Sequence, residues 1–190
     1  MIEVKRETKE TQITVKLELY GKGNAKIDTG VGFFDHMLEA FTKHAHIDME
    51  VNCTGDTHID DHHSVEDVGI VIGQALKQAI YPVKSIERFG NATVVMDEAS
   101  ITCDIDLSNR GFLVYELPIG GKVGNFDVEL VEEFFRALVF NLPMTCHLIY
   151  NRGKNKHHII EGAFKALAVA LRRAVVINEN AGIPSTKGVL

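Results

Sequence analysis

The stretch Glu10-Thr-Gln-Ile-Thr-Val-Lys-Leu-Glu-Leu19 returns 88 positions later as Glu98-Ala-Ser-Ile-Thr-Cys-Asp-Ile-Asp-Leu107. Each copy begins with glutamate and then alternates apolar with polar side chains, which is the period of a β-strand with one buried face. A single resemblance of this kind could arise by chance. It becomes informative because two further pairs follow it in the same order.

The second pair is Phe33-Phe34 and Phe134-Phe135, each within an apolar pattern of helical period. The third is the motif His-His-x-x-Glu, present at His62–Glu66 and again 95 residues later at His157–Glu161. Three pairs in one order, at similar separations, predict an internal duplication.

Each half is expected to contain a pair of strands, a short edge strand, a helix, a further strand and a second helix. The expected strands are 2–8, 12–20, 25–28 and 47–53, then 90–97, 100–107, 112–117 and 144–150; the expected helices are 33–45, 63–80, 127–141 and 158–176. This order predicts an α+β fold in which each half is a roughly four-stranded sheet with two helices on one face. The chain 1–190 is then one domain of two repeats, about 1–85 and 86–190, with an irregular tail from Asn178.

The composition narrows the class of protein. The chain has 190 residues, 45% of them hydrophobic, and a formal net charge of −6, with no basic stretch interleaved with aromatic residues. We therefore expect no nucleic-acid partner. The apolar run 166–177 is too short to span a bilayer and is interrupted by Arg172 and Arg173, so no membrane partner is expected either. Three widely spaced cysteines favour a reduced cytoplasm over a disulfide framework or a thiolate zinc site.

The repeated motif has the chemistry of a metal site, and helix geometry divides its ligands between two ions. Residues four apart lie on one face of a helix, whereas adjacent residues diverge by about 100°. One site is expected to contain His62, Glu66, His157 and Glu161, and the other His63, His158, His36 and Glu133. His36 and Glu133 precede the two His-His pairs by 26 and 24 residues. Imidazole and carboxylate donors without thiolate suit Mn²⁺, Fe²⁺, Co²⁺ or Zn²⁺.

Four runs of the sequence closely resemble the imidazoleglycerol-phosphate dehydratase family. They are Gly32–Leu38 (GFFDHML), Asp60–Asp67 (DDHHSVED), His157–Lys165 (HHIIEGAFK) and Pro184–Gly188 (PSTKG). The resemblance extends from about Arg6 to the C-terminus. It implies a hydro-lyase that converts imidazole glycerol phosphate to imidazole acetol phosphate in histidine biosynthesis. It also implies a duplicated α+β fold, two Mn²⁺ per active site and a homo-oligomeric shell of 24 subunits.

The resemblance also implies roles for individual residues. The two motifs supply metal ligands with His36, and the family usually has a fourth histidine where this chain has Glu133. The catalytic residues implied are Glu10, His62, His63, Glu66, His157, His158 and Glu161. The substrate-binding residues implied are Glu10, His36, His44, Arg88, Arg110, Lys165, Ser185, Thr186 and Lys187. Arginine and lysine among them suit a phosphate group.

The reaction explains the need for such a site. The hydrogen to be removed is not next to a carbonyl, so the imidazole ring of the substrate must supply the electrons. Two Lewis-acidic metals could stabilise that ring as an imidazolate, which expels the adjacent hydroxyl. The resemblance makes Glu10 the expected general acid/base for the carbon-bound proton.

Two other readings of the motifs stay open at this stage. A di-metal phosphoesterase is suggested by Asp61-His62-His63, although the upstream Asp-x-Asp ligands of that class are absent. A non-enzymatic metal-binding assembly protein is the second alternative. Ferritin-like bundles of that kind use long helices, whereas this chain alternates short helices with strands.

Overall fold

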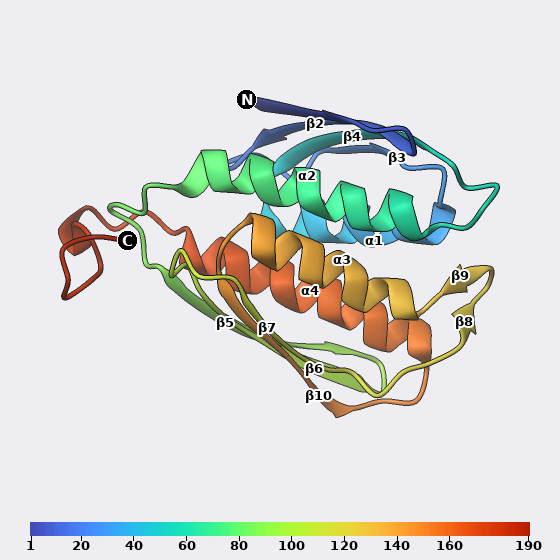
Figure 1. Ribbon diagram of the computed structural model, residues 1–190. Coiled ribbons are helices and arrows are strands. Elements are labelled where there is room, and N and C mark those ends of the chain that lie inside the picture. The colour runs from blue at the N-terminus through green and yellow to red at the C-terminus, as the bar shows by residue number, and fades with distance from the viewer.

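A computed structural model describes all residues, 1–190, and its two halves contain matching elements (Figure 1). In the first half these are β1 (Ile2–Glu7), β2 (Thr11–Glu18), β3 (Ala25–Asp28), α1 (Gly32–Ala45), β4 (Asp48–Gly55) and α2 (His62–Ile80). In the second half they are β5 (Phe89–Met96), β6 (Ala99–Asp106), β7 (Phe112–Glu116), α3 (Glu129–Asn141), β10 (Thr145–Arg152) and α4 (Lys156–Ala174). Every expected strand and helix is present, with ends within a few residues of the expected ones.

The two sheets share one topology. Their strand orders are β1-β2-β4-β3 and β5-β6-β10-β7. In both, the central strands pair antiparallel, and the short edge strand, β3 or β7, runs parallel to its neighbour. The α+β class and the duplication are therefore confirmed by the fold.

The helices form the middle of the molecule, with one sheet above them and one below (Figure 1). Helix α1 packs on α4, and α2 packs on α3. Gly69 of α2 permits the second contact, because a Cβ there would lie 2.9 Å from the backbone oxygen of Phe134. The ring of Phe134 in turn stacks on Phe164 at 5.1 Å and meets Phe34 edge-on at 5.2 Å, so aromatic contacts join the halves.

Two small elements lie outside the expected pattern. Strands β8 (Lys122–Val123) and β9 (Phe126–Asp127) form a short hairpin before α3, where the glycine-rich sequence predicts only turns. A 3₁₀ turn, η1 (Glu179–Ala181), lies in the tail that was expected to be irregular. None of the helices has the length and apolar character needed to cross a bilayer.

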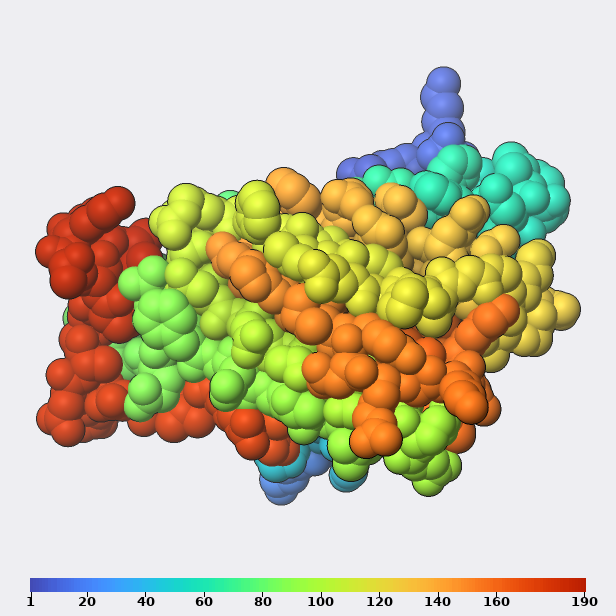
Figure 2. Space-filling model, turned by 90° about the horizontal axis from the view of Figure 1, so that it is seen from below, coloured from blue at the N-terminus to red at the C-terminus, as the bar shows by residue number.

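Both His-His-x-x-Glu motifs begin their helices at the same end of the molecule. Helices α2 and α4 start near the β8–β9 hairpin, and the C-terminal tail lies at the opposite end (Figure 1). Seen from below, the tail and the N-terminal hairpin are again at opposite ends (Figure 2). We call these the motif end and the tail end.

Candidate active site

The second motif supplies two of the three side chains in a close histidine and carboxylate group that could hold a metal ion. The Nε2 atom of His157 lies 3.1 Å from Oε2 of Glu161, and Nε2 of His36 lies 3.5 Å from the same oxygen. These are the only three histidine, cysteine or acidic residues whose ligand atoms all lie within 4.8 Å of one another. The contact of α1 with α4 brings His36 to this place, because both helices begin at the motif end.

Glu161 is nearly enclosed, with 7% of its side chain exposed. Burial alone would raise its pKa, but the ammonium of Lys165, 2.6 Å from Oε1, together with the imidazoles of His157 and His36, leaves the pKa below its ordinary value. The carboxylate is therefore ionised at neutral pH, with one oxygen facing two imidazoles and the other facing a cation.

The first motif is more open. Nε2 of His62 lies 3.5 Å from Glu66, one turn along α2, and both side chains are nearly half exposed. His62 lines a hollow of about 330 Å³ with Lys122, Asn125 and Asp127 of the β8–β9 hairpin. His63, about 100° further round the helix, instead contacts Asp56 and Glu10.

Each second histidine of the motifs has a carboxylate partner. Nδ1 of His63 lies 3.0 Å from Asp56, and Nδ1 of His158 lies 2.8 Å from Glu98. These contacts raise the pKa of both imidazoles. The hydrogen bond with His158, helped by two backbone N–H groups, lowers the pKa of Glu98 to about 2. Glu10, in the turn between β1 and β2, lies 3.9 Å from Nε2 of His63.

The two four-ligand sites expected from the sequence do not form within one chain. The motifs lie on α2 and α4, which are diagonal across the helix layer rather than paired. The β8–β9 hairpin lies between them: its Asp127 faces His62, and its Phe126 packs on Phe33, which contacts the ring of His157. His36 joins His157 and Glu161 instead of His158, and half-buried Glu133 on α3 joins no ligand group.

The tail end holds a cationic cavity of about 760 Å³. Its lining includes all of the expected phosphate-binding residues except Lys165: Arg88, Arg110, Ser185, Thr186 and Lys187. Three separate segments contribute them, namely the loop before β5, the loop after β6 and the C-terminal tail. This convergence of residues far apart in the sequence supports their assignment to one binding site.

Arg88 is the fixed member of this cavity. Its Nε and Nη2 donate to the carboxylate of Asp106 at 2.7 and 3.1 Å, and Nη1 donates to the carbonyl of Pro184 at 2.7 Å. The bidentate pair with Asp106 sets the plane of the guanidinium, and the bond to Pro184 anchors the tail. The sequence alone did not single out Asp106, which reads there as an ordinary polar position of an alternating strand.

Lys165 and His44 lie between the two ends. Lys165 is in the middle of α4 and contacts Glu161, one turn nearer the motif end. Burial, followed by the charges of Lys165 and Arg172, lowers the pKa of His44. These two residues therefore face the contact between α1 and α4, not the cationic cavity.

The cationic cavity and the second motif are far apart in one chain. The N–H of Arg88 donates to the carbonyl of Ala174, which places Arg88 at the C-terminus of α4. His157 lies 17 residues earlier on the same helix, or about 26 Å along its axis. A small phosphorylated substrate is much shorter than this separation, so one chain cannot offer both regions to one molecule.

Comparisons with known proteins agree with the geometry. The family model described as imidazoleglycerol-phosphate dehydratase matches residues 29–171. A protein of that name from Sulfurovum sp. (strain NBC37-1) is 90% identical over 190 residues, covering all of both chains. Another, from Aliarcobacter butzleri, is 66% identical over the same length.

Two solved structures share the fold. The imidazoleglycerol-phosphate dehydratase of Staphylococcus aureus is 38% identical, with a TM-score of 0.83, and covers 94% of this chain and 100% of its own. The enzyme of Pyrococcus furiosus is 39% identical, with a TM-score of 0.86, and covers 98% of this chain and 100% of its own. The chain therefore belongs to the imidazoleglycerol-phosphate dehydratase family, the hydro-lyases of histidine biosynthesis.

Proposed function

We propose that this chain converts imidazole glycerol phosphate to imidazole acetol phosphate with the help of Mn²⁺, at sites completed by neighbouring copies of the chain. The observation that carries the proposal is the close group of His36, His157 and Glu161. Family membership supplies the reaction, and the group supplies a place for a divalent cation.

The donor set of this group fits a divalent first-row metal. It offers two imidazole nitrogens and one ionised carboxylate and contains no thiolate, which suits Mn²⁺ with exchangeable positions. We expect the remaining proposed ligands to come from a neighbouring copy of the chain; they are His62, His63, Glu66, Glu133 and His158. When bound, Mn²⁺ supplies Lewis-acid charge beside the imidazole ring of the substrate.

The chain's own residues account for the other steps. Arg88, Arg110 and Lys187 bind the phosphate and fix the direction of the three-carbon unit. The C–O bond next to the ring breaks, and the hydroxyl departs as water after it receives a proton. Glu10 takes the proton from the neighbouring carbon. The resulting enol rearranges to the ketone.

We also propose that the chain assembles into a large homo-oligomer, the 24-subunit shell that the family resemblance implies. The separation of about 26 Å between the second motif and Arg88 supports this, because a site with both needs two chains. Three free, buried cysteines are consistent with a cytoplasmic location.

A product assay tests the function against its alternatives. Purified protein is incubated with imidazole glycerol phosphate and Mn²⁺, and the ketone and inorganic phosphate are both measured. Ketone formation without phosphate release supports the dehydratase. Phosphate release identifies a phosphoesterase, and neither product identifies a metal-binding assembly protein.

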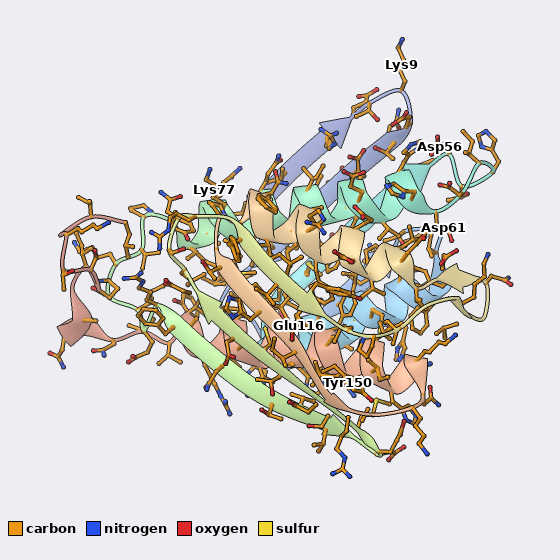
Figure 3. All side chains as sticks on the ribbon, turned by 60° about the horizontal axis from the view of Figure 1, so that its bottom comes forward. Lys9, Asp56, Asp61, Lys77, Glu116 and Tyr150 are labelled. Carbon is orange, nitrogen blue, oxygen red and sulfur yellow. The ribbon has the colours of Figure 1, made fainter.

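Removing Arg110 should weaken substrate binding. A charged hydrogen bond contributes about 1.5–3 kcal/mol, so Arg110→Ala is expected to raise KM by roughly 10- to 100-fold with a smaller change in kcat. Lys77→Ala is the control, since Lys77 is an exposed cation in the last turn of α2 (Figure 3). Equal KM values for Arg110→Ala and the parent protein would remove Arg110 from the site.

Removing the acidity of Glu10 should slow the chemical step. Glu10→Gln is expected to lower kcat by about 10²- to 10⁴-fold, the usual contribution of a general acid/base, with KM little changed. Glu7→Gln neutralises an exposed carboxylate on the same hairpin and should behave as the parent protein does. Steady-state kinetics of both variants decide the matter, and near-normal kcat in Glu10→Gln would exclude Glu10 as the proton acceptor.

A further inference from the structure

The two repeats hold the second histidine of their motifs with carboxylates from different places. In the second half, Nδ1 of His158 contacts Oε2 of Glu98 at 2.8 Å, and Glu98 lies in the turn between β5 and β6. In the first half, Nδ1 of His63 contacts Asp56 at 3.0 Å, and Asp56 lies in the loop that leads into α2 (Figure 3).

The two carboxylates at Nδ1 do not occupy equivalent positions of the repeats. Glu98 is the counterpart of Glu10, 88 positions earlier, yet Glu10 lies on the Nε2 side of His63, at 3.9 Å. Conversely, the residue seven positions before His158 is Asn151, which donates to Thr102 at 2.8 Å and does not touch the imidazole. Each histidine thus has one carboxylate at Nδ1, although the duplication would have provided the same one to both.

Glu98 is held more firmly than Asp56. Its second oxygen, Oε1, accepts the backbone N–H groups of Lys154 at 3.0 Å and Asn155 at 2.7 Å, just before α4 begins. Asp56 has no other side-chain hydrogen bond besides its contacts with His63. The two backbone hydrogen bonds therefore orient the Glu98 carboxylate independently of its contact with the imidazole.

We propose that Glu98 is a positioning residue, which keeps the single proton of neutral His158 on Nδ1 and leaves the Nε2 lone pair free to bind the metal. A neutral imidazole has one donor and one acceptor nitrogen, and a carboxylate beside Nδ1 requires the donor there. Carboxylate partners of metal-binding histidines act in this way in other metalloproteins. Asp56 does the same for His63, which leaves Glu10 free for proton transfer. The inference rests on the proposed metal site.

The isosteric variant Glu98→Gln should reverse the tautomer of His158. The two backbone N–H groups require an acceptor, so the glutamine carbonyl should turn toward them. Its NH₂ group then faces Nδ1 and forces that nitrogen to accept. The proton of His158 moves to Nε2, the atom that would otherwise bind the metal. Asp56→Asn is not constrained in this way, because its carbonyl can rotate toward Nδ1 of His63.

The experiment combines two measurements on the full-length protein at pH 8. The tautomer of His158 is read from ¹⁵N chemical shifts in solid-state NMR of metal-free, ¹⁵N-histidine-labelled protein, assigned by subtracting the spectrum of His158→Asn. Mn²⁺ affinity is measured from the EPR signal of free Mn²⁺. We expect Nδ1–H in the parent protein, Nε2–H in Glu98→Gln, and about 10- to 100-fold weaker Mn²⁺ binding in that variant.

Asp97→Asn is the matched control. Asp97 neighbours Glu98, is 80% exposed and lies 3.8 Å from Nε2 of His158, so it carries the same charge near the same ring without touching Nδ1. Its Mn²⁺ affinity should change less than about 5-fold, and Asp56→Asn should keep the Nδ1–H tautomer of His63.

Three results would overturn the proposal. One is an Nε2–H tautomer of His158 in the parent protein, a result that can be obtained without any variant. Another is unchanged Mn²⁺ affinity in Glu98→Gln while the parent protein binds Mn²⁺. If the parent protein binds no Mn²⁺ at all, the proposed metal-dependent function fails as well, so the two failures are distinguishable.

Discussion

Replacing Glu161 by glutamine should abolish most dehydratase turnover. Glu161 places one carboxylate oxygen against both His36 and His157, and glutamine removes the charge while keeping the shape. Loss of metal-derived stabilisation of the transition state is expected to cost about 4 kcal/mol, or roughly 1,000-fold in kcat/KM. Steady-state kinetics at saturating Mn²⁺ measures the loss, and Mn²⁺ titration should show weaker binding.

The free energy of unfolding should also decrease in Glu161→Gln, but by less than the activation free energy increases. Lys165 loses its ionised partner at a site where only 22% of its side chain is exposed. Glu116→Gln, which changes an exposed carboxylate of β7 (Figure 3), is the control for charge alone. Activity of Glu161→Gln within a few-fold of the Glu116→Gln control would contradict the assignment of Glu161.

Two inactive variants should restore each other when they share a particle. The first is His157→Ala, which disrupts the motif end; the second is Arg110→Ala with Lys187→Ala, which disrupts the cationic cavity at the tail end. If each site takes these two regions from different chains, random assembly leaves about a quarter of the sites intact. The variants are co-expressed with different tags, the mixed particles are purified on both tags, and turnover is measured at low substrate concentration.

The control for this experiment is the same pair mixed after separate purification and without exchange of subunits. That mixture should show only the sum of the two residual activities. Co-assembled particles that are no more active than this mixture would mean that one chain supplies the whole site. The separation of about 26 Å along α4 would then need a different explanation.

The sequence predicted the fold well because its signals were local. Alternation in Thr11–Glu18 and in Ala99–Asp106 identifies strands with one buried face, and the repeat doubles the weight of each signal. The order of elements then leaves few topologies. The two sheets adopt the same strand order because both halves follow the same pattern.

The grouping of ligands was less predictable, because it depends on contacts between helices that local spacing does not specify. Spacing four apart correctly pairs His157 with Glu161 and His62 with Glu66. The pairing of helices is decided by the tertiary structure. Because α1 packs on α4, His36 lies beside His157. The β8–β9 hairpin breaks the repeat and lies in a glycine-rich segment for which the sequence predicts only turns, although it contacts both motif regions.

The carboxylates of Glu98 and Asp56 show that the repeat does not predict side-chain contacts. Glu98 was visible as the first residue of the second strand copy, but its likeness to Glu10 gave no hint that it contacts His158. A duplication preserves backbone positions better than side-chain roles. Asp56 and Asn151 are a second example. They occupy equivalent places before the two His-His pairs, but only Asp56 contacts a histidine of its motif.

The most direct test of the account is the turnover of imidazole glycerol phosphate by the metal-stripped protein before and after Mn²⁺ is restored. Stripped protein should form no detectable imidazole acetol phosphate, and added Mn²⁺ should restore turnover as it fills the sites. Full turnover by protein shown to be free of metal would contradict the account, and so would protein that binds Mn²⁺ but remains inactive.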